Sequence, residues 1–188
     1  RSNLFRVAPE QPDHFRPLHR TVAEFVGARW MGRMIEQHGN PARAAARLLA
    51  LISTDHGIPS SLRGLAAWLP RFSPAWLGPA IIETEPYAVL RYGDPDNLSA
   101  SQGAAMLDSF ERLIAFDPYF RAGDWGRNSA KGLVQPPLTE KVRHIFTDSN
   151  ATYQMRSIVF DALHKASGDL PFTSELVAIA LDTSPRRA

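Results

Sequence analysis

The sequence contains no cysteine among its 188 residues. This absence excludes a disulfide framework, a thiolate nucleophile and a zinc site with cysteine ligands. A chain without cysteine suits a reducing compartment, and we therefore expect a cytoplasmic protein.

Long apolar runs and strong charge are also missing. No apolar run approaches the roughly 18 to 20 residues that span a bilayer as a helix, and no basic-then-apolar leader opens the chain. The formal net charge is only +2, without a dense basic run. We therefore expect neither a membrane nor a nucleic acid as partner. With 44% hydrophobic and 21% charged residues, the composition is that of a globular protein.

Recognised catalytic motifs are absent as well. The sequence has no G-x-x-x-x-G-K-[ST] phosphate loop, no H-E-x-x-H helix and no G-x-S-x-G turn. Its six histidines have no metal-ligand spacing, since His14 and His19, for example, are five residues apart. We therefore expect no metal site, no catalytic residue and no bound cofactor in this segment, and no hydrolysis of ATP by it.

Helical periodicity dominates what is present. β-Branched runs are short and none alternates over several residues, so strands have little support. The pattern predicts an all-α fold, an irregular helical array in which Gly39-Asn40 ends the first helix and Ser99 with Gln102 caps a later one. Prolines cut the chain between residues 70 and 92 into short helices. The longer helices are expected at residues 18–38, 41–53, 59–69, 99–116, 139–146, 150–166 and 171–181.

Residues 117–137, "DPYFRAGDWGRNSAKGLVQPP", have no apolar period and are predicted to form a long loop. Aromatic and basic side chains alternate in it, a mixture that suits anions, nucleotides or an acidic protein surface. The alternative is an ordered connection whose aromatic rings pack into the helices. The candidate binding residues are Tyr119, Arg121, Trp125, Arg127 and Lys131.

The stretch "HFRPLHRTVAEFVGARW", residues 14–30, combines apolar and charged positions in an unusual way. At about 100° per residue it predicts a helix with two apolar faces, sandwiched between neighbours. Glu24 falls within one face and Arg29 within the other, so each charge is expected to have a partner. The first face contains Leu18, Val22, Phe25, Val26 and Trp30, and the second contains Ala28, Met31 and Ile35.

The order Phe15, Leu18-His19-Arg20-Thr21, Glu24-Phe25 and Ala28 resembles a signature of NACHT-type NTPases of the signal-transducing STAND class. The resemblance implies that residues 1–40 end a NACHT-associated helical or winged-helix region, with the ATPase upstream of Arg1. It makes His19 the nucleotide-sensing residue, in contact with ADP phosphates, and Thr21, Glu24 and Arg29 structural residues of the motif. ATP or ADP would then bind to the full-length parent, for which an oligomer is also expected.

The segment "MRSIVFDALHKASGD", residues 155–169, looks like the second helix of a HEAT-type repeat. Residues 41–188 are accordingly predicted to be a HEAT-like α-solenoid fragment, continuous with the first region. The function expected from this is a non-catalytic regulatory, sensor or scaffold segment of a NACHT-like signalling NTPase, which recognises a protein partner or other domains of its own chain. The alternative is a free-standing all-helical enzyme or small-ligand-binding protein that uses the 117–137 loop.

Overall fold

The structure is a computed structural model that describes residues 5–8, 11–17, 19–55, 57–122 and 130–165. The chain divides into two compact units, unit 1 (Arg1–Asp94) and unit 2 (Pro95–Ala188). The division falls within Gly93-Asp94-Pro95-Asp96, a run of residues typical of a turn. It does not test the proposed passage from a NACHT-associated region to helical repeats after residue 40, which stays a prediction.

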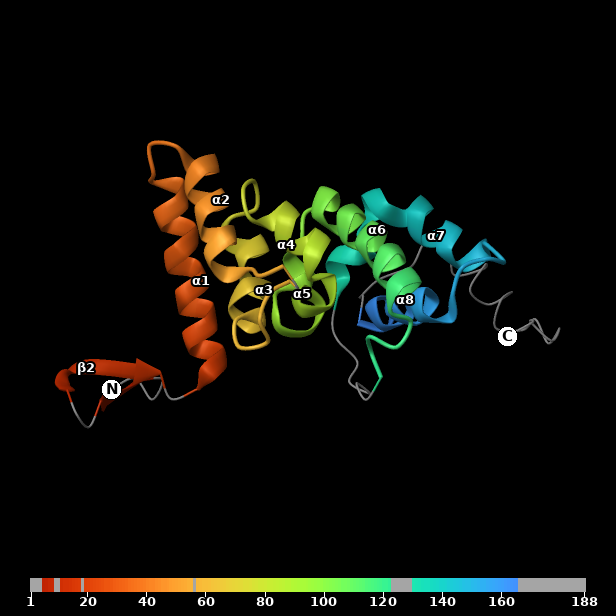
Figure 1. Ribbon diagram of the computed structural model, residues 1–188. Helices are drawn as coiled ribbons and strands as arrows, with labels where there is room; N and C mark the ends of the chain where they lie inside the picture. Colours follow the sequence, from red (N-terminus) through yellow and green to blue (C-terminus); the bar gives the residue numbers. More distant parts are fainter. Residues whose placement is uncertain (1–4, 9–10, 18, 56, 123–129, 166–188) are drawn as a thin grey trace. The chain divides into compact units, whose positions relative to one another are not determined.

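The described residues contain eight α-helices, which confirms the predicted helical fold (Figure 1). The helix predicted at residues 171–181 lies outside the described part of the chain. Unit 1 contains α1 (Arg20–Glu36), α2 (Pro41–Ile52), α3 (Arg63–Phe72), α4 (Gly78–Thr84) and α5 (Pro86–Tyr92), and unit 2 contains α6 (Ala100–Phe116), α7 (Thr139–Thr147) and α8 (Tyr153–Lys165).

A short antiparallel hairpin of β1 (Phe5–Ala8) and β2 (Gln11–Pro17) precedes α1, at a place where the sequence offers little support for strands. Val7 pairs with Phe15, and the register shifts between Val7 and Ala8. The sequence signal is weak because β1 has only four residues. Strand β2 has seven residues, but Phe15 is its single large apolar side chain and two of its residues are prolines, so it shows no alternating pattern.

The helix starts follow the local signals in the sequence. The side chain of Asn40 accepts a hydrogen bond from the backbone N–H of Arg43 at 3.0 Å, and Pro41 is the first helical residue of α2. At α6 the predicted capping box is confirmed. The Ser99 hydroxyl accepts from the Gln102 N–H at 3.3 Å, and the Gln102 side chain accepts from the Ser99 N–H at 3.0 Å.

Helix α3 extends past the position at which the sequence predicts its end. It continues through the buried Pro70 to Phe72, although proline lacks the N–H that a helix interior needs. The cost is limited because Pro70 lies in the last turn, where the Ser73 N–H still donates to the Leu69 carbonyl at 2.8 Å. Proline therefore weakens this helix near its end without terminating it.

Helix α1 is buried on one side only, which corrects the prediction of two buried faces. Ala28 and Ile35 of the second predicted face are buried, and α1 contacts α3 and α2. Phe25 of the first predicted face also packs edge-on against Trp68 and Phe72 of α3. On the first predicted face, Val26 is 43% exposed and Trp30 is 60% exposed. The periodicity identified both apolar faces, but it cannot show whether a neighbouring helix covers each of them.

Each unit has a core of its own. In unit 1, α3 packs against α1, α4 and α5. In unit 2, α6 and α8 enclose the 3₁₀ turn η2 (Lys131–Leu133), which lies within the predicted loop. Further 3₁₀ turns are η1 (Pro95–Asn97) and η3 (Pro136–Leu138). Within the described ranges, no helix has the length and apolarity needed to cross a membrane. Fully buried side chains include Leu69, Ile81 and Val89 in unit 1 and Met106, Phe110, Leu133 and Val159 in unit 2.

Candidate functional site

Unit 2 contains a half-open cleft with a volume of about 470 Å³. Its walls come from the second half of α6, the end of α7 and the first turn of α8. Helix α8 contacts both α6 and α7 and so joins the two walls. The lining residues are Glu111, Ile114, Ala115, Pro118, His144, Ile145, Asp148, Asn150, Ala151, Thr152, Gln154 and Met155.

The floor of the cleft is apolar. Ile114 of α6, Ile145 of α7 and Met155 of α8 contribute one side chain each, and all three are buried. Because every helix supplies one floor residue, the floor forms only when the three helices pack together. A flexible Met beside branched Ile side chains gives a surface that adapts to apolar groups.

Backbone hydrogen bonds fix the turn between α7 and α8 at one wall. The Asp148 carboxylate accepts from the Asn150 N–H at 2.8 Å, and the Asp148 carbonyl accepts from the Arg156 guanidinium at 2.6 Å. The Thr152 hydroxyl accepts from the Met155 N–H at 3.2 Å and so caps α8. This wall is therefore a short, internally bonded turn.

The segment that follows α6 also lines the cleft, through Pro118. The side-chain amide of Gln154 donates to the Pro118 carbonyl at 3.2 Å. The Phe120 ring stacks on Phe110 with 6.0 Å between the ring centroids. These two contacts hold the first part of the predicted loop against α6 and α8, and Tyr119 between them is 77% exposed.

Three exposed aromatic side chains adjoin the lining residues. Phe116 is 90% exposed, Tyr119 is 77% exposed and Tyr153 is 82% exposed. Phe116 follows the lining residue Ala115, and Tyr119 and Tyr153 flank the lining residues Pro118 and Gln154. Single exposed apolar residues are common, but three that directly neighbour lining residues in the sequence make this end of unit 2 a candidate interaction surface. We call these three residues the aromatic rim.

The charged groups that line the cleft are acidic. Glu111 and Asp148 contribute carboxylates and His144 an imidazole, whereas no Lys or Arg is found among the lining residues that the structure describes. This set accepts hydrogen bonds and favours a ligand with N–H donors or positive charge. In the described ranges, no group of three or more His, Asp or Glu side chains is arranged to hold a metal ion.

The candidate binding residues of the predicted loop, residues 117–137, have different surroundings in the structure. Arg121 forms an ion pair with Asp161 of α8 at 2.6 Å, with exposed side-chain fractions of 15% and 22%. The Arg121 guanidinium is thus held within the protein. At this residue the structure agrees with the alternative interpretation of residues 117–137, an ordered connection rather than a binding loop. Trp125 and Arg127 lie outside the described residues.

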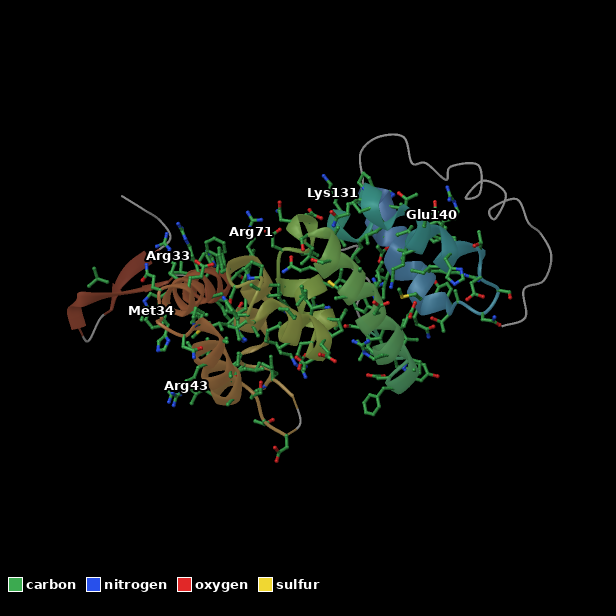
Figure 2. The ribbon with its side chains drawn as sticks, turned by 90° about the horizontal axis from the view of Figure 1, so that it is seen from above. Arg33, Met34, Arg43, Arg71, Lys131 and Glu140 are labelled. Atoms are coloured by element: carbon green, nitrogen blue, oxygen red, sulfur yellow. The ribbon has the colours of Figure 1, made fainter. Side chains whose placement is uncertain are left out.

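Lys131 and Tyr119 lie at opposite ends of α6. The backbone N–H of Lys131, which is labelled in Figure 2, donates to the Asp96 carboxylate at 2.8 Å, just before α6. Tyr119 follows the other end of this helix. The 17 residues of α6 correspond to about 25 Å at the usual rise per residue. The structure therefore does not bring these two predicted binding residues together.

The residues of the NACHT-like motif lie at the start of α1. His19 is the N-cap residue and is exposed, and its side chain makes no capping hydrogen bond. Glu24, with 14% of its side chain exposed, pairs with Arg20 at 2.6 Å, which confirms the expected partner. Thr21 and Arg29 are exposed, so the prediction of a buried, paired Arg29 is wrong.

Sequence reasoning did not identify the cleft or its aromatic rim. Phe116 and Tyr153 lie at opposite ends of two helices that are far apart in the sequence. Neither residue belongs to a motif, and the sequence carries no signal that the ends of these helices border a cleft. Only the packing of α8 against α6 and α7 reveals them.

Comparison of the chain with models of protein families, with curated proteins and with solved structures gave no match. The resemblance to NACHT-type NTPases therefore rests on residues 15–28 alone. The candidate site rests on the geometry of unit 2.

Proposed function

We propose that this chain is a non-catalytic recognition segment of a larger protein, and that the cleft of unit 2 binds a short segment of a protein partner. The observation that carries the proposal is an apolar floor made by Ile114, Ile145 and Met155, together with the exposed aromatic rim, whose residues directly neighbour lining residues in the sequence. Burial of exposed aromatic rings is a main source of binding free energy at protein interfaces.

The acidic lining indicates the chemistry of the bound segment. Glu111 and Asp148 favour a Lys or Arg side chain in the partner, and the floor favours an aliphatic or aromatic one. A peptide that carries an apolar residue next to a basic residue satisfies both requirements. The Tyr119 and Tyr153 rings could also stack against the positive group.

The test is selection of peptides from a random display library on the whole chain, followed by a variant that fills the cleft. Ala115→Trp places an indole ring in the cleft from the exposed side of α6. Selected peptides are expected to share an apolar-basic pair and to lose at least about tenfold in affinity for this variant.

The matched control is Ala105→Trp. Ala105 is also an exposed alanine of α6, but it does not line the cleft, so this variant should bind the peptides as the parent chain does. Peptides that bind both variants equally, or a library without enrichment, would refute the cleft as a peptide site.

We further propose that the larger protein is a cytoplasmic NACHT-type signalling NTPase, in which His19 senses ADP and HEAT-like helices continue the chain. The support is the order of residues in the motif from Phe15 to Ala28. The exposed position of His19 at the start of α1 is compatible with contact to a nucleotide. Sequencing of the complete reading frame for a phosphate loop upstream tests this proposal.

A small-ligand-binding protein is the second candidate function. The cleft volume of about 470 Å³ falls within the range of small-molecule pockets, and its lining favours an apolar amine. The predicted 117–137 loop contributes Pro118 to the lining, whereas Arg121 is occupied by Asp161. A screen of amine fragments, with loss of binding in Ala115→Trp, would favour this candidate over a peptide.

A further inference from the structure

Helix α1 presents an exposed apolar row in unit 1, separate from the cleft of unit 2. Val26, Trp30 and Met34 are spaced four residues apart and are 43%, 60% and 50% exposed. Such a row lies along one side of a helix as a ridge. Their partial exposure makes these residues a surface available for contact rather than a part of the core.

Two arginines run beside this ridge. Arg29 and Arg33 are exposed and are themselves one helical turn apart. Neither guanidinium forms an ion pair with any residue in the described ranges. Figure 2 labels Arg33 together with its neighbour Met34 on α1. The ridge therefore has a basic edge whose charge is not neutralised by any residue that the structure describes in this unit.

The opposite face of α1 holds this surface in place. Ala28, Gly32 and Ile35 are buried, and a methyl group at Gly32 would overlap the carbonyl oxygen of Phe72 in α3. So close a packing leaves α1 little freedom to turn its ridge inward. The exposed ridge is thus a fixed feature of the unit.

We propose that this face of α1 is a docking surface for an amphipathic α-helix of a partner protein with acidic residues beside its apolar stripe. A ridge of side chains spaced four apart fits the groove between the equivalent rows of another helix. Arg29 and Arg33 select for Asp or Glu at the edge of that groove. A second copy of this chain would instead bring a second row of arginines.

The experiment uses a fluorescent, stapled helical peptide with leucines at i, i+4 and i+8 and glutamates beside them, titrated with the whole chain. We expect saturable binding, weakened at least about tenfold by Trp30→Ala and by the double change Arg29→Glu with Arg33→Glu. Trp76→Ala is the matched control, because Trp76 is a 43% exposed tryptophan of unit 1 that lies outside α1. It should leave the affinity unchanged.

Four outcomes overturn the proposal. No binding of the acidic peptide, or equally tight binding of its lysine counterpart, removes the argument from charge. Binding of phosphatidylserine vesicles that Trp30→Ala abolishes, without binding of the acidic peptide, makes this face a membrane-contact surface. Dimers of the chain alone that Trp30→Ala dissociates, seen by sedimentation, make it a contact between copies. None of these results bears on the cleft of unit 2, so the two proposals fail separately.

Discussion

The Cα of Gly32 in α1 lies so close to the carbonyl oxygen of Phe72 in α3 that a methyl group at residue 32 would overlap this oxygen. In an exposed helix, replacement of Gly by Ala is stabilising by about 0.5 to 1 kcal/mol. Here the obstacle is backbone, which cannot rotate away. We therefore expect Gly32→Ala to lower the free energy of unfolding by about 1 to 3 kcal/mol, as measured by urea denaturation.

The control is Gly39→Ala in the turn after α1. Nothing lies within 4 Å of a methyl group at this position, and the change should alter the free energy of unfolding by less than about 0.5 kcal/mol. A stabilised Gly32→Ala would show that α1 and α3 are not in this close contact.

The ion pair of Arg20 and Glu24 should contribute little to stability. Its atoms are 2.6 Å apart, but the Arg20 side chain is 65% exposed, so solvent screens the attraction. A double-mutant cycle with Arg20→Ala and Glu24→Ala should give a coupling free energy of about 0.3 to 1 kcal/mol. A coupling of several kcal/mol would mean that the pair is shielded from water.

The ion pair of Arg121 and Asp161 should contribute more, because both side chains are largely buried, with 15% and 22% exposed. Arg121→Met leaves the Asp161 carboxylate without its partner and should lower the free energy of unfolding by about 1 to 3 kcal/mol. Lys131→Met is the control, since Lys131 is an exposed cation of the same predicted loop. Equal stability of the two variants would contradict a structural role for Arg121.

The last prediction concerns His19 in the full-length parent. If its imidazole donates to an ADP phosphate in the closed state only, His19→Ala should weaken ADP binding and shift the population to the open state. Calorimetric titration of both proteins with ADP measures the change. His38→Ala is a suitable control, because His38 is an exposed histidine at the other end of α1. Identical ADP affinity for all three proteins would remove the nucleotide-sensing role.

Local signals predicted the helices well because capping and periodicity depend on residues close in sequence. The capping box at Ser99 and the apolar side of α6 at Met106 and Phe110 are examples. The hairpin before α1 was missed because β1 is short and β2 has a single large apolar side chain, Phe15, so neither strand shows an alternating pattern. The continuation of α3 past Pro70 was missed because a proline is expected to end a helix, and the sequence does not show that the helix continues for two more residues, to Phe72.

The sequence by itself determined the helical class, most helix boundaries and the apolar character of both sides of α1. Tertiary structure decided which side of α1 is covered, since burial depends on whether another helix lies against a face. It also decided that Arg121 pairs with Asp161 while Tyr119, two residues earlier, remains exposed. Ile114, Ile145 and Met155 meet in one floor only through the packing of α6, α7 and α8. Contacts between residues far apart in the chain leave no local pattern, because the physical interaction that joins them exists only once the helices have packed.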